Sequence, residues 1–227
     1  MSLELNKVYK MDCLEFMKTL PDKSIDLLLT DPPYGINADK SAEDFAHRKR
    51  GRNARTVGKD YGKTEYNWDS AIPAEEYFDE MFRVSKNQII WGGNYFGLPA
   101  SNCWIVWDKM IPDGWAAADC ELAWTSFKIT SRMFRYRWCG YMQSNMQQKE
   151  KRYHPTQKPV KLFEFCLKKF TKPGDIVLDI YAGSGTTAIA ALGTDRKYIL
   201  VEREQIYIDA INKRIGSVAK SVMDFLK

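Results

Sequence analysis

A short apolar run near the start of the chain ends abruptly at two prolines. In SIDLLLTDPPYGIN, residues 24–37, the run at 25–29 has the length and composition of a buried strand. The segment Asp31-Pro32-Pro33-Tyr34 cannot continue a ladder, because each proline lacks an N–H and has a fixed φ. The strand therefore delivers a carboxylate, a rigid backbone and an aromatic ring to one edge of a sheet.

Strand-like and helix-like segments alternate along most of the chain. Further strand-like runs occur at 6–12, 87–96, 103–109, 120–127, 133–138, 175–179 and 196–204. Helix-like segments occur at 13–22, 73–86, 156–171, 187–195 and from Gln205 onward. This order predicts an α/β fold, with a mostly parallel sheet covered by helices on both faces. We expect one domain over 1–227, with a polar insertion at about 36–70.

Composition excludes several classes of protein. The five cysteines are scattered without a CxxC pair, and the histidines are His47 and His154. This pattern argues against a disulfide framework and against a metal site. No apolar stretch approaches the roughly 20 residues of a membrane span. The N-terminus has no signal-type apolar core, which predicts a cytoplasmic protein without a membrane partner.

Positive charge is concentrated in two stretches, although the net charge is only +5. Residues 47–63 hold seven Lys or Arg, one acid and three glycines, which favours a flexible basic loop over a helix. Residues 127–142 mix basic with aromatic side chains, a pattern suited to phosphate contact and base stacking. The alternatives are a solvated loop in the first case and, in the second, a strand with one core face and one wet face.

A glycine turn follows the strand-like run at 175–179. In DIYAGSGTTA the pattern Gly183-x-Gly185-x-x-Ala188 lies between a strand and a helix, and Glu202 follows 19 positions after Gly183. Glycines allow close backbone approach to a nucleoside, and an acid at this spacing can hold ribose hydroxyls. Asp179, at the entry to the turn, suits a cationic ligand better than a pyrophosphate. A sulfonium cofactor with a free ammonium group fits, which points to S-adenosylmethionine (AdoMet).

The strand order needed for such a site is incomplete at the C-terminus. A nucleotide-binding half requires three strands, and the chain ends after the second strand and its helix. The N-terminal run at 6–12 is a spare strand that ends in an acid, Asp12. A circular permutation would place this strand in the same sheet, with Asp12 beside the adenine.

The motifs together resemble those of the amino-methylating DNA methyltransferases in their permuted beta order. The chain has DPPY at 31–34, HPTQKP at 154–159, DIYAGSGT at 179–186 and MDC at 11–13. Ile180 stands where that family often has Pro, and Tyr181 replaces the usual Phe. The resemblance spans about 12–214. It implies a Rossmann-like AdoMet-dependent methyltransferase fold, AdoMet as cofactor and double-stranded DNA as partner, for a monomer or homodimer.

The resemblance also implies the roles of individual residues. The catalytic set would be Asp31, Pro32, Pro33 and Tyr34. Cofactor contacts would come from Asp12, Cys13, Asp31, Thr156, Lys158, Asp179, Tyr181, Ala182, Gly183, Ser184, Gly185, Thr186 and Glu202. Within this set Lys158 would receive the cofactor carboxylate, and His154 would be a hydrogen-bonding brace. DNA contacts would come from Arg48, Lys49, Arg50, Arg52, Arg55, Lys128, Arg132, Arg135 and Arg137, with a small target-recognition region at about 107–150.

The tetrapeptide then has a chemical purpose. An exocyclic base amine is a poor nucleophile, because its lone pair is delocalised into the ring. Asp31 and the Pro32 carbonyl can each accept one amine hydrogen and so favour a pyramidal nitrogen, while the prolines hold the carbonyl stiffly. The base must leave the duplex, which costs a few kcal/mol, and stacking on Tyr34 offsets about 1–3 kcal/mol of this.

Other functions leave more of the sequence unexplained. In the family, Asp at the first motif position accompanies adenine and Ser accompanies cytosine, so Asp31 favours N6-adenine over N4-cytosine. An inactive DNA-binding subunit would not need both intact motifs. An NAD-dependent oxidoreductase would account for the glycine turn but not for DPPY. A protein-glutamine or RNA methyltransferase usually has Asn at the first position.

Overall fold

The computed structural model describes residues 3–37, 69–112, 118–139, 142–154 and 156–225. The strands are β1 (Lys7–Lys10), β2 (Ile25–Thr30), β3 (Ser85–Trp91), β4 (Trp104–Asp108), β5 (Cys120–Thr125), β6 (Arg132–Arg135), β7 (Trp138–Cys139), β8 (Met142–Gln143), β9 (Ile176–Asp179) and β10 (Lys197–Glu202). The helices are α1 (Cys13–Lys18), α3 (Glu75–Val84), the 3₁₀ turn η1 (Gly93–Tyr95), α4 (Val160–Phe170), α5 (Thr186–Leu192) and α6 (Gln205–Phe225).

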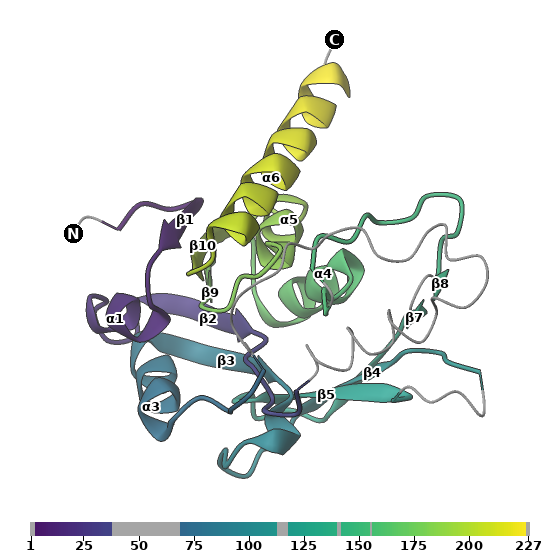
Figure 1. Cartoon of the computed structure of the whole chain (residues 1–227). Helices are drawn as coiled ribbons and strands as arrows, with labels where there is room; N and C mark the ends of the chain where they lie inside the picture. The colour runs from purple at the N-terminus through teal and green to yellow at the C-terminus, as the bar shows by residue number, and fades with distance from the viewer. Residues whose placement is uncertain (1–2, 38–68, 113–117, 140–141, 155, 226–227) are drawn as a thin grey trace.

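One eight-stranded sheet runs through the molecule in the order β1-β10-β9-β2-β3-β5-β4-β6 (Figure 1). The strand pairs β1–β10, β10–β9, β9–β2 and β2–β3 are all parallel. By contrast, β5 pairs antiparallel with both β3 and β4. The predicted mostly parallel sheet is therefore confirmed. The N-terminal strand lies beside β10, in parallel, where the incomplete C-terminal half needed it.

Helices cover both faces of this sheet, as predicted. Leu27 and Leu29 pack in one buried cluster with apolar side chains of α4, α5 and α6. Leu28 points to the opposite face and packs in a second cluster with α1 and α3. The alternation along β2 follows from the two-residue period of a strand, and both of its faces are apolar because both are covered.

The region at 107–150 is continuous with this sheet over much of its length. Within it, β5 lies between β3 and β4, and β6 pairs with β4 in parallel. Among the described residues of this region, β7 and β8 form a separate two-stranded sheet. Most of the insertion at about 36–70 lies outside the described residues. In the part of the chain that the structure describes, no helix is long and apolar enough to cross a membrane.

The turn between β9 and α5 depends on close packing against the C-terminal helix. Gly185 has a φ of +76°, and a Cβ built on it would lie 2.8 Å from Ile211 Cγ1 of α6. Gly174 also has a positive φ, +86°, but a Cβ there would meet no atom within 4 Å. The two glycines share a backbone requirement and differ in their surroundings.

We expect Gly185→Ala to be more destabilising than Gly174→Ala. The positive φ costs an alanine about 1–2 kcal/mol at either position, and overpacking against Ile211 adds about 1–3 kcal/mol at position 185. Urea titrations of both variants measure the difference in free energy of unfolding. Equal losses would show that α6 moves aside freely and that the packing of Gly185 on Ile211 is unimportant.

Candidate active site

A cavity of about 700 Å³ opens where the carboxyl ends of β1, β10, β9 and β2 meet. Its lining contains every predicted catalytic residue and every predicted cofactor residue except Gly185, which caps α5. Parallel strands present their carboxyl ends at one edge, so motifs far apart in sequence converge there. The structure thus brings DPPY, HPTQKP and the glycine turn into one site.

Glu202 closes the glycine turn at the end of β10. Its Oε2 accepts a hydrogen bond of 2.8 Å from the Gly183 amide, and its Oε1 accepts from the amides of Arg203 and Glu204. Burial raises the pKa of this carboxyl, and the backbone donors oppose the rise. Glu202 therefore fixes the turn, and as a residue of the cavity lining it keeps acceptor capacity for a ligand.

On the opposite side of the turn, α1 begins at the cavity. Asp12 caps this helix, because its Oδ1 accepts hydrogen bonds from the amides of Leu14 and Glu15. Cys13 is buried, and burial raises the pKa of its thiol to about 11. The thiol is therefore neutral at ordinary pH, and it serves as part of an apolar wall.

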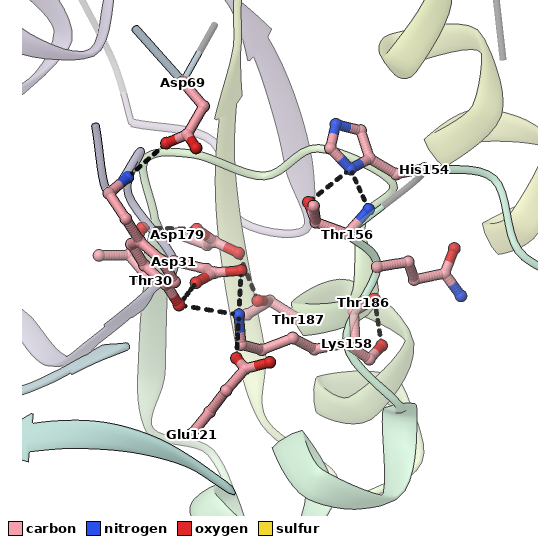
Figure 2. Close-up of polar contacts among 12 residues, drawn as sticks. Thr30, Asp31, Asp69, Glu121, His154, Thr156, Lys158, Asp179, Thr186 and Thr187 are labelled. Atoms are coloured by element: carbon pink, nitrogen blue, oxygen red, sulfur yellow. Dashed lines mark hydrogen bonds and ion pairs between the residues drawn. The ribbon is translucent and has the colours of Figure 1, made fainter. Parts of the chain in front are cut away.

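Asp179 is a buried carboxylate at the end of β9. Its Oδ1 accepts from the Thr30 hydroxyl at 2.9 Å and from the Tyr181 amide at 3.2 Å, and its Oδ2 accepts from the Thr187 hydroxyl (Figure 2). Burial raises the pKa of Asp179 to about 6, although these donors oppose the rise. The Asp179 side chain thus connects β2, β9 and α5. All three of its hydrogen-bond donors are uncharged.

Asp31 and Tyr34 interact within the DPPY segment. The Tyr34 hydroxyl donates to Asp31 Oδ1 at 2.6 Å, and the Tyr34 ring stacks on Tyr95 with a centroid distance of 5.0 Å. Gly92 leaves room for this ring, since a Cβ there would lie 2.1 Å from it. Burial raises the pKa of Asp31, and the nearby Lys158 ammonium opposes the rise.

Asp69 holds the backbone that follows the two prolines. Its Oδ1 accepts from the Tyr34 amide at 2.6 Å and from the Gly35 amide at 2.9 Å, and the residue is 1% exposed. Its carbonyl also accepts from the Asn37 amide at 3.0 Å. Sequence reasoning missed Asp69, because it interacts with the tetrapeptide across more than thirty intervening residues and no local pattern marks it.

Lys158, itself buried, lies at the centre of a partly buried group of charges. Its ammonium contacts the Asp31 carboxylate and lies 3.1 Å from Glu121 Oε2 (Figure 2). Lys109 pairs with Glu121 Oε1 at 2.6 Å. Although burial opposes it, the two ammonium groups lower the pKa of Glu121 to about 2. Glu121 and Lys109 were also missed; the available signal was a single acid inside the apolar strand CELAWT.

The rest of HPTQKP supports this lysine. His154 Nδ1 accepts a hydrogen bond from the Thr156 amide at 3.3 Å, and its ring packs against Tyr207. Burial lowers the pKa of His154 to about 4, so the imidazole is neutral. The Lys158 carbonyl accepts from the Thr186 hydroxyl at 3.3 Å, which ties the motif to the glycine turn. Among the described residues, no group of three potential ligands could hold a metal ion.

The four predicted DNA-contact residues that the structure describes lie outside the cavity lining. Arg135 pairs with Asp108 at 3.3 Å, and Arg137 Nε donates to the Met110 carbonyl. Arg132 donates to the Thr130 hydroxyl at 2.6 Å, and Lys128 is exposed. The other five, Arg48, Lys49, Arg50, Arg52 and Arg55, lie outside the described residues.

The aromatic residues at 127–138 pack into the core. Phe127 contacts Phe170, Phe134 contacts Phe165, and Trp138 is buried with its Nε1 donating to the Gln157 carbonyl. The arrangement is that of a strand with one core face and one wet face. The alternative of an aromatic surface for base stacking is wrong for these side chains, because they pack against the core.

Comparisons with known proteins agree with this site. The model of a family described as DNA methylase (N6_N4_Mtase) matches residues 94–213. That span is more than half of the chain, so the chain belongs to the N6/N4 DNA methyltransferase family, whose methyl donor is AdoMet. Type II methyltransferase M.HinfI of Haemophilus influenzae is 29% identical over 97% of this chain and 71% of its own length.

Two solved structures show the fold. The M1.HpyAVI–SAM complex superposes with a TM-score of 0.54 at 21% identity, covering 92% of this chain and 98% of that one. PvuII DNA methyltransferase, which is cytosine-N4-specific, superposes with a TM-score of 0.54 at 21% identity, covering 91% of this chain and 84% of that one. The predicted Rossmann-like methyltransferase fold is thereby confirmed.

We expect Asp179→Asn to stabilise the protein above pH 6. The amide can keep all three hydrogen bonds, by accepting from Thr30 and Tyr181 and donating to Thr187, and it removes the buried charge. A carboxyl whose pKa rises on folding from 3.8 to about 6 binds more protons when folded, so its ionisation lowers stability as pH rises through that window. Urea titrations should show no gain at about pH 4 and a gain approaching about 3 kcal/mol at pH 8. A gain independent of pH would contradict burial of the charge.

Proposed function

We propose that this chain is a beta-class, DPPY-type DNA methyltransferase that transfers a methyl group from AdoMet to the N6 amine of a flipped-out adenine. One observation carries the proposal: Asp31 lines the same cavity as the glycine turn and Glu202. An amine held at Asp31 would therefore lie in the same cavity as a cofactor bound at the turn. The N-terminal strand beside β10 supports the permuted order.

The residues of the turn fit the cofactor. Glu202 and Asp12 would border the ribose and adenine, and residues 181–186 would lie under the methionine part. Asp179 supports a cationic ligand, because it is a buried carboxylate raised in pKa and would gain from a nearby ammonium. When bound, the cofactor supplies an electrophilic methyl group, and the protein needs no metal for the transfer.

The protein's own contribution is to bind and orient the amine. Asp31 accepts one amine hydrogen and the Pro32 carbonyl accepts the other. Both acceptors are held before the base arrives, Asp31 by Lys158 and Tyr34, and the backbone after Pro33 by Asp69. Such preorganisation lowers the barrier, since little reorientation remains at the moment of reaction. The Tyr34 ring, packed on Tyr95, lines the cavity where the base would stack.

DNA is the substrate that the family implies, and we place its contacts outside the cavity. Lys128, Arg132, Arg135 and Arg137 would meet the duplex on the wet side of 127–138, with the five arginines and lysines of 48–55 as further phosphate contacts. Methylation of cytosine N4 is the second candidate, favoured by the likeness to PvuII DNA methyltransferase. Asp31, in the position where Ser accompanies cytosine, favours adenine.

The product identifies the reaction. We expect the wild-type protein to introduce N6-methyladenine into DNA from a methyl-free host, detected by mass spectrometry of digested nucleosides. Asp31→Ala should reduce transfer at least about 1,000-fold, because it removes an amine acceptor that the transition state needs. Its AdoMet affinity should change little. N4-methylcytosine as the product would favour the second candidate, and near-normal turnover of Asp31→Ala would exclude the mechanism.

We expect Glu202→Ala to weaken AdoMet binding about 10- to 100-fold, measured by calorimetry without DNA. A charged acceptor for ribose hydroxyls contributes about 1.5–3 kcal/mol, and the glycine turn also loses its anchor. Glu204→Ala, two residues along the same segment, is the matched control and should keep near-normal affinity. If both variants bind as the wild type does, the ribose site lies elsewhere.

A further inference from the structure

The Lys158 ammonium is surrounded by acceptors from three residues. It contacts Asp31 Oδ2, lies 3.1 Å from the Tyr34 hydroxyl oxygen and lies 3.1 Å from Glu121 Oε2. Asp31 and Tyr34 accept hydrogen bonds from it, whereas Glu121 Oε2 has no hydrogen-bond partner among the described residues and interacts with it through charge alone. The Lys158 side chain is also 5% exposed. A cofactor carboxylate at Lys158, as the motif resemblance implies, would compete with the two carboxylates that already neutralise this ammonium.

The second carboxylate of the group is held from two adjacent strands. Glu121 projects from β5 and Lys109 follows β4, and these strands pair antiparallel. Lys109 also lies 5.4 Å from the centre of the Trp107 ring. Asp31, Glu121, Lys158 and Lys109 carry two negative and two positive charges. Their sum is zero, which limits the cost of burying the group.

The position of Lys158 creates a competition for Asp31. In the proposed reaction Asp31 must accept a hydrogen from the base amine, yet Lys158 and Tyr34 already contact its two oxygens. A lysine with no other partner would keep its hold on Asp31, because an unpaired buried ammonium is costly. Glu121 removes that difficulty, since Lys158 can loosen from Asp31 and still keep a carboxylate partner.

We propose that Lys158 and Glu121 act together as positioning residues for Asp31. Lys158 keeps the Asp31 carboxylate ionised and oriented, and Glu121 takes a larger share of the ammonium when the base amine arrives. The proposal rests on the proposed function, because it concerns the same site. It assigns Lys158 to the catalytic carboxylate and away from the cofactor.

Opposite effects on the acidity of Asp31 follow from the charges around it. Burial and Glu121 of β5 raise the pKa of Asp31, whereas Lys158 and the Tyr34 hydroxyl lower it. Asp179 of β9 interacts with it as a like charge, and Lys109 balances Glu121. Loss of the Lys158 charge should therefore raise this pKa, and loss of the Glu121 charge should lower it.

The test is the pH dependence of a single turnover on duplex DNA, from about pH 5 to about pH 9, in Lys158→Met and Glu121→Gln. In Lys158→Met the acid limb should move up by about one pH unit or more, with a rate at least about ten-fold lower at pH 7. In Glu121→Gln the acid limb should move down, while the plateau falls at least about three-fold as Lys158 binds Asp31 more exclusively. AdoMet affinity should stay within about three-fold of the wild type in both.

Two further variants serve as controls. Lys161→Met removes an exposed lysine on α4, paired with Glu164, and should leave rate, acid limb and affinity unchanged. The double variant Lys158→Met/Glu121→Gln keeps the net charge of the group at zero, so it tests the proposal even if Lys158→Met does not fold. Its acid limb should lie between those of the single variants.

Each contrary result has a separate meaning. Weaker AdoMet binding in Lys158→Met, by about ten-fold or more with an unmoved acid limb, would assign Lys158 to the cofactor and overturn the proposal. Acid limbs that move in the same direction in both single variants, or a double-variant limb outside the range set by the two single variants, would also overturn it. A wild-type protein that does not methylate DNA would instead refute the proposed function.

Discussion

The parallel pairing of β2 with β9 is the contact on which the site depends. Leu28 lies opposite Leu178 in this register, so the two strands end together, and the Thr30 hydroxyl reaches Asp179 at 2.9 Å. A shift of one residue would exchange the side chains that β2 presents to its two faces, and both close-packed clusters would lose their fit. Packing on the two faces of one strand thereby fixes the position of Asp31 relative to the glycine turn.

The same edge of the sheet carries several charged side chains that do not help the fold to be stable. Asp179 has hydroxyl and amide donors around it, and Asp31 shares Lys158 with Glu121. A buried carboxylate raised in pKa costs stability at neutral pH, so a neutral isostere would serve the fold better. The cost has a reason in the proposed chemistry, which needs an anion near a cationic cofactor and another near a base amine. Stability and function make opposite demands on these residues.

Features set by residues close together in the sequence could be predicted, whereas contacts between residues far apart in the sequence could not. The strand before DPPY and the turn GSGT carry local signals, in apolar runs, prolines and glycines, and both were predicted. Asp69 reaches back to Tyr34 and Glu121 reaches forward to Lys158, through contacts that no local pattern specifies. The HPTQKP motif predicted that Lys158 lines the site, but it could not show that two carboxylates already surround its ammonium.

The stretch at 127–138 could not be interpreted from its sequence for a different reason. A base-stacking surface and a strand with an aromatic core face both predict the same two-residue alternation of basic and aromatic side chains. A strand with alternating arginines and aromatic rings can present either set to solvent. The α4 helix decides between them, since Phe165 and Phe170 receive Phe134 and Phe127 and leave Arg135 outside. The exposed pair of Arg135 with Asp108 contributes little to stability, as exposed ion pairs generally do. A DNA phosphate could therefore replace Asp108 at small cost, so the core that takes up the aromatic rings also leaves the arginines available for the proposed substrate.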